Sequence, residues 1–388
     1  MWVQLMTSKA QIGPLALLSA AALSLPAFSA SQPTERVVSV NTSVYQEGDA
    51  NAAEVVFGDL QRFRVKTNQF NLSVPIGRDW SMSLGYDNEA MSGASPWGTV
   101  AASDGSGDLI MSGASIDDSR NGVDVNLTRH WRGQSLGISV GYSGEHDYHS
   151  RSVGLNYERD FFKQNTTLAL SASYASDELT PTDAQLFQRL EKGSKHTRSF
   201  YASVNQLLSP VSMLNLGFGI TKRTGELSDP YKLRDIRPGK RVERTLTASY
   251  RRYFDWQTSS LAVNYRYFWD SYSVGAHTLA MSWMLGEETA LQWGPMLRYY
   301  SQSEAAFYTP FDRYDQPETA AQSSDFRLST FGAVSYGLKA RYRMNAVQVS
   351  MQYERYDSGS GYALSSAKTT HPGLVDFDVV SLGAEYRF

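Results

Sequence analysis

The sequence predicts an all-β protein, a transmembrane antiparallel β-barrel of about sixteen strands. Three observations support this: the chain ends in a strand, about sixteen segments alternate apolar and polar residues, and short connections alternate with long ones. In the last segment Val380, Leu382 and Tyr386 share one face of a strand that runs to the final residue, Phe388. A barrel in lipid needs such a closing strand, because an open edge would leave backbone groups without hydrogen bonds.

The first thirty residues have the organisation of an export signal. Lys9 precedes the apolar run 13–25 (GPLALLSAAALSL), and the small residues after Pro26 form a cleavage zone. The run is too short to cross a bilayer as a helix. We therefore predict a signal peptide at 1–30, export by the Sec route, and a barrel domain at 31–388 whose mature chain begins near Ala30 or Ser31.

Alternating segments predict sixteen strands, an even number as bacterial barrels require. They lie near 36–46, 61–74, 79–88, 121–131, 134–143, 151–161, 166–175, 197–208, 212–222, 242–254, 259–269, 274–285, 289–300, 327–342, 346–356 and 376–388. The first two are the least regular. The alternative is therefore a fourteen-strand barrel with an N-terminal segment elsewhere.

The connections differ in length in a regular way. Short ones such as 77–79, 132–134 and 209–211 alternate with long ones, which lie near 87–120, 175–196, 221–241, 301–326 and 356–375. Outer-membrane barrels have short periplasmic turns and longer extracellular loops. The pattern predicts periplasmic N- and C-termini and a place in the outer membrane of a Gram-negative bacterium.

Composition agrees with a barrel and excludes several other classes. The chain has 23 Tyr and 8 Trp, which suit the girdles at the two membrane interfaces. Cysteine is absent, so catalysis by cysteine and metal binding by cysteine are excluded. A net charge of -3 gives no reason to expect nucleic acid. We predict no cofactor and no resident metal.

The later strands place charged residues on the inward face if their apolar residues face lipid. This set comprises Arg251, Arg266, Arg298, Lys339, Glu354, Glu385 and Arg387. Charges across a wet lumen can select solutes by sign. The alternative, which we favour, is an internal salt-bridge network that braces the wall. Mixed signs argue against a strongly selective pore.

A repeated pentapeptide, MSGAS at 91–95 and at 111–115, flanks a turn-forming stretch at 103–108. This predicts a hairpin, either an ordered extracellular one or a loop that folds into the lumen as a constriction or ligand contact. The residues of that constriction would be Met91, Ser92, Gly93, Met111, Ser112 and Gly113. A less favoured hypothesis is that Asp104, Asp108, Asp117 and Asp118 bind Ca²⁺, although their spacing is not that of an EF-hand.

His146, His149 and Ser150 form the one histidine-rich cluster. A His–Ser pair at a barrel rim could hydrolyse lipid, and two His could hold a metal. In a loop, however, residues three apart share no fixed face. We therefore predict that the protein is not an enzyme and has no catalytic residues. We expect His371, before Pro372 and Gly373, to form a turn ahead of the last strand.

Several motifs are distinctive in combination: the first MSGAS with Pro96 and Trp97, LSDPYKL at 227–233, LRYYSQS at 297–303, SSDFRLS at 323–329, GLK at 337–339 and YERY at 353–356. On these motifs the chain, from about residue 35 to its end, resembles a family of uncharacterised Gram-negative outer-membrane proteins that is classified as a domain of unknown function. The resemblance implies a barrel and supplies no reaction. It also implies a small lipoprotein or periplasmic redox proteins as partners.

Tyr386 and Phe388 resemble the C-terminal signal that the barrel insertion machinery recognises.

The favoured function is a porin-like channel, passive or weakly selective, or the outer-membrane part of a transport or redox-linked system. One alternative is a non-conducting scaffold barrel for periplasmic or lipoprotein partners. A second alternative is the rim-located lipid hydrolase. Outer-membrane lipid is a partner in each case.

Overall fold

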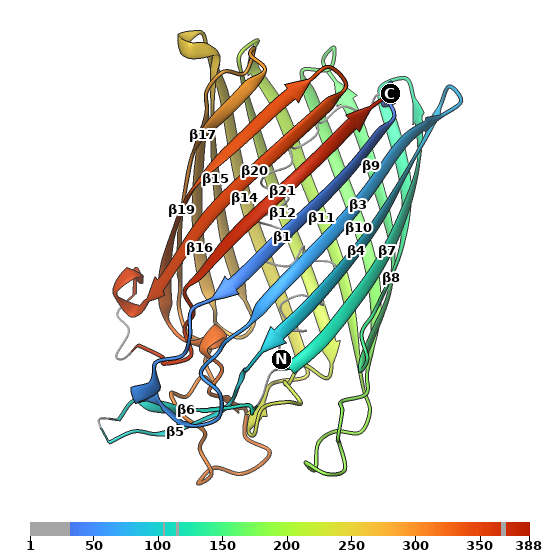
Figure 1. Cartoon of the computed structure of the whole chain (residues 1–388). Coiled ribbons are helices and arrows are strands. Elements are labelled where there is room, and N and C mark those ends of the chain that lie inside the picture. The colour runs from blue at the N-terminus through green and yellow to red at the C-terminus, as the bar shows by residue number, and fades with distance from the viewer. Residues whose placement is uncertain (1–31, 104, 114–115, 366–369) are drawn as a thin grey trace.

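The computed structural model describes residues 32–103, 105–113, 116–365 and 370–388, and its barrel is shown in Figure 1. The predicted signal peptide at 1–30 lies outside these residues. Among the described residues no helix is long and apolar enough to cross a membrane.

Sixteen strands, each antiparallel to its neighbours, close the barrel. They are β1 (Val37–Glu47), β3 (Arg64–Ile76), β4 (Trp80–Gly93), β7 (Ile116–Trp131), β8 (Gln134–Gly144), β9 (Tyr148–Phe161), β10 (Thr166–Leu179), β11 (Gly193–Ser209), β12 (Ser212–Gly225), β14 (Lys240–Phe254), β15 (Ser259–Asp270), β16 (Gly275–Met284), β17 (Leu291–Gln302), β19 (Phe331–Met344), β20 (Val347–Gly359) and β21 (Phe377–Arg387). All sixteen predicted segments are confirmed. The fourteen-strand alternative is wrong, because β1 and β3, its two doubtful segments, are wall strands.

β1 and β21 join the two ends of the chain. Their register runs from Val37 opposite Arg387 to Glu47 opposite Phe377. Beyond the strands, the Phe388 backbone N–H donates to the Arg36 carbonyl at 3.0 Å. This junction lies at the rim that carries the short turns (Figure 1). That this rim faces the periplasm stays a prediction.

The outer face of the wall is apolar. Ile138, Val140 and Leu382 are 52%, 53% and 54% exposed, whereas Ser135 and Ser381, on the inner face, are buried. Apolar surface on this scale is unfavourable in water and is the surface that lipid covers. Five Trp follow the short-turn rim, as an interfacial girdle requires: Trp80, Trp131, Trp256, Trp283 and Trp293. The barrel therefore spans a membrane.

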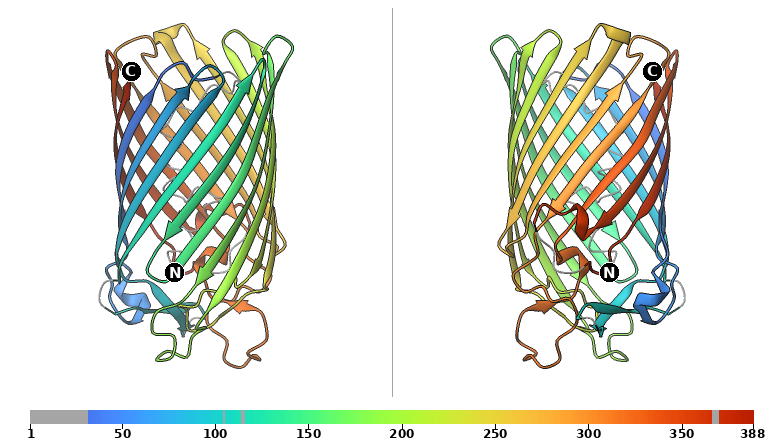
Figure 2. Two further views of the ribbon diagram at one scale, coloured as in Figure 1. Left: turned by 90° about the vertical axis from the view of Figure 1, so that its right-hand side faces the viewer. Right: turned by 90° about the vertical axis from the view of Figure 1, so that its left-hand side faces the viewer.

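The long connections gather at the other rim and contain structure of their own (Figure 2). Three short strands, β2 (Val55–Phe57), β5 (Pro96–Ala101) and β6 (Gly107–Met111), form one sheet, and β13 (Asp235–Ile236) pairs with β18 (Gln322–Ser323). The described residues also include four short 3-10 turns: η1 (Ala52–Glu54), η2 (Trp256–Thr258), η3 (Phe326–Leu328) and η4 (Ser360–Tyr362). The β5–β6 hairpin is the predicted one.

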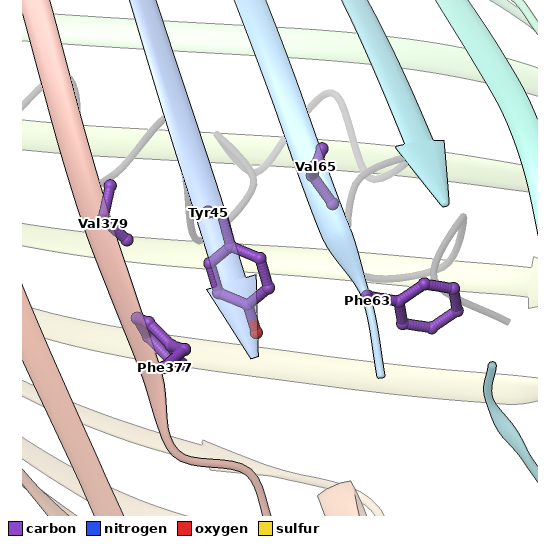
Figure 3. Packing of buried hydrophobic residues seen from close by; sticks show 5 residues of the cluster. All are labelled: Tyr45, Phe63, Val65, Phe377 and Val379. Carbon is purple, nitrogen blue, oxygen red and sulfur yellow. The ribbon is translucent and has the colours of Figure 1, made fainter. Parts of the chain in front are cut away.

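An apolar cluster lines the inner wall just inside the loop-side rim (Figure 3). Its members are Tyr45, Phe63, Val65, Phe377 and Val379, with Met91 and Tyr356 packed against them. The rings of Tyr356 and Phe377 stack at 4.4 Å. Because the inner wall is otherwise mostly polar, this cluster gives the segment 48–63, which ends on Phe63, an apolar anchor in the barrel.

We expect Phe63→Ala to lower the free energy of unfolding by about 3–5 kcal/mol, since it removes a buried ring and leaves a cavity. Phe57→Ala, on the same segment but 63% exposed, is the control and should cost about 0.5 kcal/mol or less. Urea-induced unfolding in lipid vesicles measures both. Equal losses in the two variants would contradict the anchoring role of the cluster.

Candidate functional site at the loop-covered mouth

Loops from different sides of the barrel meet over the loop-side mouth. We use "the cap" for the described residues of 94–113, 180–192, 226–239 and 303–330. The Leu233 N–H donates to the Trp97 carbonyl at 2.7 Å, and the Asp312 N–H donates to that of Thr99 at 2.8 Å. The Thr182 N–H donates to the Tyr231 hydroxyl at 3.1 Å. Four family-like motifs therefore lie together here, since Gln302 of the LRYYSQS motif also donates to the Ser329 carbonyl.

Two aspartates give the two central motifs their local shape. Asp229 precedes Pro230, and its side chain accepts the Tyr231 N–H at 3.0 Å, which forms a tight turn. Asp325 is the N-cap of η3 and accepts the Arg327 N–H at 3.0 Å. Both carboxylates then remain available on their other sides for arginine side chains.

A buried ion network joins these two loops. Arg237 donates to Asp325 at 2.7 Å and to Asp235 at 3.0 Å. Arg327 Nε donates to both Asp325 oxygens at 2.9 Å, and its Nη2 reaches Asp229 at 3.3 Å. Asp325 is fully buried. Burial alone would raise the pKa of the Asp325 carboxyl, but Arg327, Lys232 and Arg237 hold that pKa well below its usual range. Removal of one partner would leave a buried charge uncompensated.

The β5–β6 hairpin is held to the same loops. Asp312, buried in the 303–330 loop, accepts the Ser324 hydroxyl at 2.6 Å and the Thr99 N–H at 3.4 Å. Gly98 permits this approach, because a Cβ there would lie 2.6 Å from Asp312 Oδ2. The structure thus places the hairpin beyond the rim, against loops from other parts of the wall (Figures 1 and 2).

The six residues of the predicted constriction lie around the base of this hairpin. Met91 packs on the apolar cluster, and Met111 is fully buried with Leu109 in a second cluster. Ser112 accepts the Ser95 N–H at 3.0 Å. Gly93 has φ +127°, and a Cβ there would lie 2.4 Å from the Arg62 carbonyl oxygen. Ser92 and Gly113 are exposed.

His371 fastens the connection before β21 to the cap. Its Nδ1 accepts the Gly373 N–H at 2.8 Å, which leaves Nε2 to donate to the Ser324 carbonyl at 2.9 Å. The sequence indicated only a turn here. Burial, reinforced by Lys232, lowers the pKa of His371 to about 4. The hydrogen bond from Gly373 requires the neutral ring, since a protonated Nδ1 cannot accept one.

An acidic cluster lies beside the cap. One carboxylate oxygen from each of Asp118, Glu145 and Asp147 falls within 4.8 Å of the others. The Tyr231 hydroxyl donates to Asp147, which connects the cluster to the cap. Burial and then the charges of Asp118 and Asp147 raise the pKa of Glu145 to about 8. These oxygens could jointly coordinate a hard cation such as Ca²⁺.

This cluster differs from the Ca²⁺ hypothesis drawn from the sequence. It contains Asp118 but takes its other members from the histidine-rich segment. Asp108 lies on β6 and is not part of it. Asp104 and the side chain of Asp117 lie outside what the structure describes.

The His–Ser pair of the hydrolase hypothesis does not form. Ser150 is buried, and its hydroxyl donates to Asp177 at 2.7 Å. His149 precedes it on β9, so it projects to the opposite face of the wall, where its ring bonds to the Tyr142 hydroxyl at 3.1 Å. His146 is exposed in the connection. The arrangement gives Ser150 no histidine base.

The structure places the predicted lumen charges on the inner face by alternation. Exposed Tyr265, Leu297 and Leu338 flank Arg266, Arg298 and Lys339 on their strands. Arg251, Glu354 and Glu385 likewise alternate with outward residues. Glu354 is fully buried, and Arg387 donates to Glu385 at 2.8 Å.

The sequence did not identify a second set of inward charges near the loop-side rim. Three are cross-strand pairs: Glu89–Arg120 at 2.6 Å, Asp177–Lys195 at 3.1 Å and Glu243–Arg223 at 3.1 Å. A fourth pair joins Glu47 on β1 to Arg62, just before β3, at 2.9 Å. Only the strand register reveals them, because Glu89 meets Arg120 and Asp177 meets Lys195 as ladder partners. They brace the wall beneath the cap.

Comparison with known proteins places the chain in a family. Residues 15–370 match a family model described as "Protein of unknown function (DUF3570)". No curated protein matches the chain.

Among solved structures, CdiB from Acinetobacter baumannii aligns with a TM-score of 0.50 and 10% identity over 90% of this chain and 60% of that one. A bacterial polysaccharide outer membrane secretin aligns at 0.49 and 10% over 90% and 98% of the two chains. OccK1 (OpdK) from Pseudomonas aeruginosa aligns at 0.45 and 10% over 91% and 98%. At such identities the likeness concerns the fold alone.

Acidification should loosen the cap through His371. The folded-state pKa of about 4 lies below the usual 6.5. The contribution of His371 to stability is therefore complete above pH 6.5 and is lost as pH falls toward 4, by up to about 2 kcal/mol at pH 5. Hydrogen exchange of the Gly373 amide, corrected for its intrinsic rate, should show that loss of protection.

His371→Asn is the matched variant, because its side-chain oxygen can still accept the Gly373 N–H but does not titrate. Its protection should be independent of pH between 7 and 5. An equal loss of protection in both proteins would assign the effect to other groups.

Proposed function

Because the chain belongs to the DUF3570 family, whose description carries no activity, we propose a function from the structure: a porin-like outer-membrane channel, passive or weakly selective, whose loop-side mouth the cap closes. Sixteen strands enclose a lumen of the width at which porins hold an aqueous path. The inward charges have both signs, which favours weak selectivity. The ion network of the cap is the observation that carries the proposal of closure.

The network has the properties that a latch needs. It joins the loop after β12 to the loop after β17, and the β5–β6 hairpin on the β4 side of the wall bonds to both loops. Two of its bonds, Arg237–Asp325 and Arg327–Asp229, join the two loops, and none involves a residue of a wall strand, so the network can break without breaking the wall. Its charges are buried, and a buried charge without a partner is costly. The charges are therefore either paired with one another or hydrated, without stable intermediate arrangements.

Single-channel recording of the refolded protein in a planar bilayer tests the proposal. We expect the wild type to be mostly closed and Asp325→Asn to raise the open probability at least about tenfold, because a broken buried pair costs about 3–5 kcal/mol. Asp315→Asn is the control: its pair with Arg313 lies in the same loop at 2.6 Å, but its side chain is 59% exposed. That variant should behave as the wild type.

If the wild type, Asp325→Asn and a variant that lacks residues 94–113 all fail to conduct, the channel proposal is wrong. It would favour the scaffold alternative, in which the barrel serves a lipoprotein or periplasmic redox partner. Steady opening of the wild type, unchanged in Asp325→Asn, would keep the pore but remove the latch.

A further inference from the structure

Four cations form a row on the outer face of the wall, on the loop side of the apolar belt. They are Arg151 on β9, Arg198 on β11, Lys222 on β12 and Arg244 on β14. The first three are exposed and Arg244 is half-buried. Just below them, toward the short turns, lie Val153, Phe200 and Leu246, each 44–47% exposed. The row therefore marks the boundary between the lipid-covered surface and the loops.

The strand register makes the row continuous. Arg198 and Lys222 are direct partners in the β11–β12 ladder, and Arg244 is the partner of Ile220, one outward position from Lys222. On the other side, Arg198 pairs with Tyr174, and the Arg198 guanidinium lies 6.0 Å from the centre of that ring. Arg151 is the ladder partner of Ser176, which is the next outward residue after Tyr174 on β10.

The four cations of the row have no carboxylate partner among the described residues. Like charges directly opposite one another in a ladder destabilise a sheet. Within the described part of the chain none of the four cations pairs with a carboxylate. On β9, β10, β11, β12 and β14 alternation places a single carboxylate outward, Glu178, and its ladder partner is His149. By contrast, the outward Arg355 on β20 is neutralised by Asp357 and Asp378 at 2.8 and 2.9 Å.

We infer that the row binds the phosphate groups of an anionic lipid in the leaflet on the loop side. Phosphates offer several acceptor oxygens, which suit arginine forks, and they lie at the depth where the hydrocarbon ends. The acyl chains of the same lipid would cover Val153, Phe200 and Leu246. Two Tyr–His pairs lie at the row, each with a hydrogen bond of 3.1 Å: Tyr174–His196 within it and Tyr142–His149 at its β8 end. Interfacial aromatic groups of this kind favour the headgroup level.

The inference goes beyond the channel proposal and holds whether or not the barrel conducts. It is tested on the full chain, refolded in neutral detergent, with lipid A as the phosphate-bearing probe and the same lipid without phosphates as the comparison. Native mass spectrometry counts the bound lipid. We expect the wild type to retain the phosphorylated lipid preferentially, and retention to fall in high salt, which screens exposed charges.

The double variant R198Q/K222Q should bind lipid A about thirtyfold more weakly, the loss expected for two cations near an anionic surface. The charge-matched control R64Q/K66Q removes two exposed outward cations from β3, at a distant part of the wall, and should stay within about twofold of the wild type. If the double variant fails to fold, Lys222→Gln alone should lose about fivefold.

A second readout separates binding from folding. In neutral detergent without lipid, the double variant should unfold at the same temperature as the wild type or higher, because it relieves the like-charge pair. Added lipid A should raise the unfolding temperature of the wild type more than that of the variant. Equal lipid retention by the wild type and the double variant, or equal retention of the lipid without phosphates, would overturn the inference.

Discussion

The ladder between β1 and β21 closes the sheet, and the rest of the molecule depends on that closure. In lipid, a backbone N–H or C=O without a partner has no water to bond, so an open edge is too costly to persist. Closure forces every wall residue to face either lipid or lumen. It also places all the connections at two rims, where the chain is free to become short turns at one rim and long loops at the other.

The irregular features of this protein lie at the loop-side rim. The long connections are irregular, but they are not loose: buried aspartates and arginines of two loops neutralise one another, and β13 and β18 add a small ladder between the same loops. Beneath them salt bridges between neighbouring parts of the wall brace its inner face, and the apolar cluster around Tyr45 and Phe377 holds the segment 48–63. Under the channel proposal, the rigid wall would stay intact while the loop contacts of the cap break.

The inner and outer charges of the wall follow different rules. Near the rim the inward charges of β4, β7, β10 and β11 occur as opposite pairs across adjacent strands, so they satisfy themselves at low local dielectric. The outward row on β9 to β14 is of one sign and stays hydrated or meets a lipid headgroup. The inner face near the rim thus carries ion-paired charges of both signs, whereas the outer row carries cations alone, so the two faces meet different chemical environments.

The sequence by itself determined the wall. The period of two is a local property, so the strands, the lipid-facing residues and the inward positions of Arg266, Arg298 and Glu354 follow from alternation without knowledge of any partner. Only the tertiary structure decided the cap and the charge pairs. Asp229 and Arg327 are 98 residues apart, and Arg237 and Asp325 are 88 apart. The buried role of His371 likewise depends on Ser324. Loops have no periodicity to align, and a ladder partner depends on register and closure, so no local pattern identifies which charge will meet which.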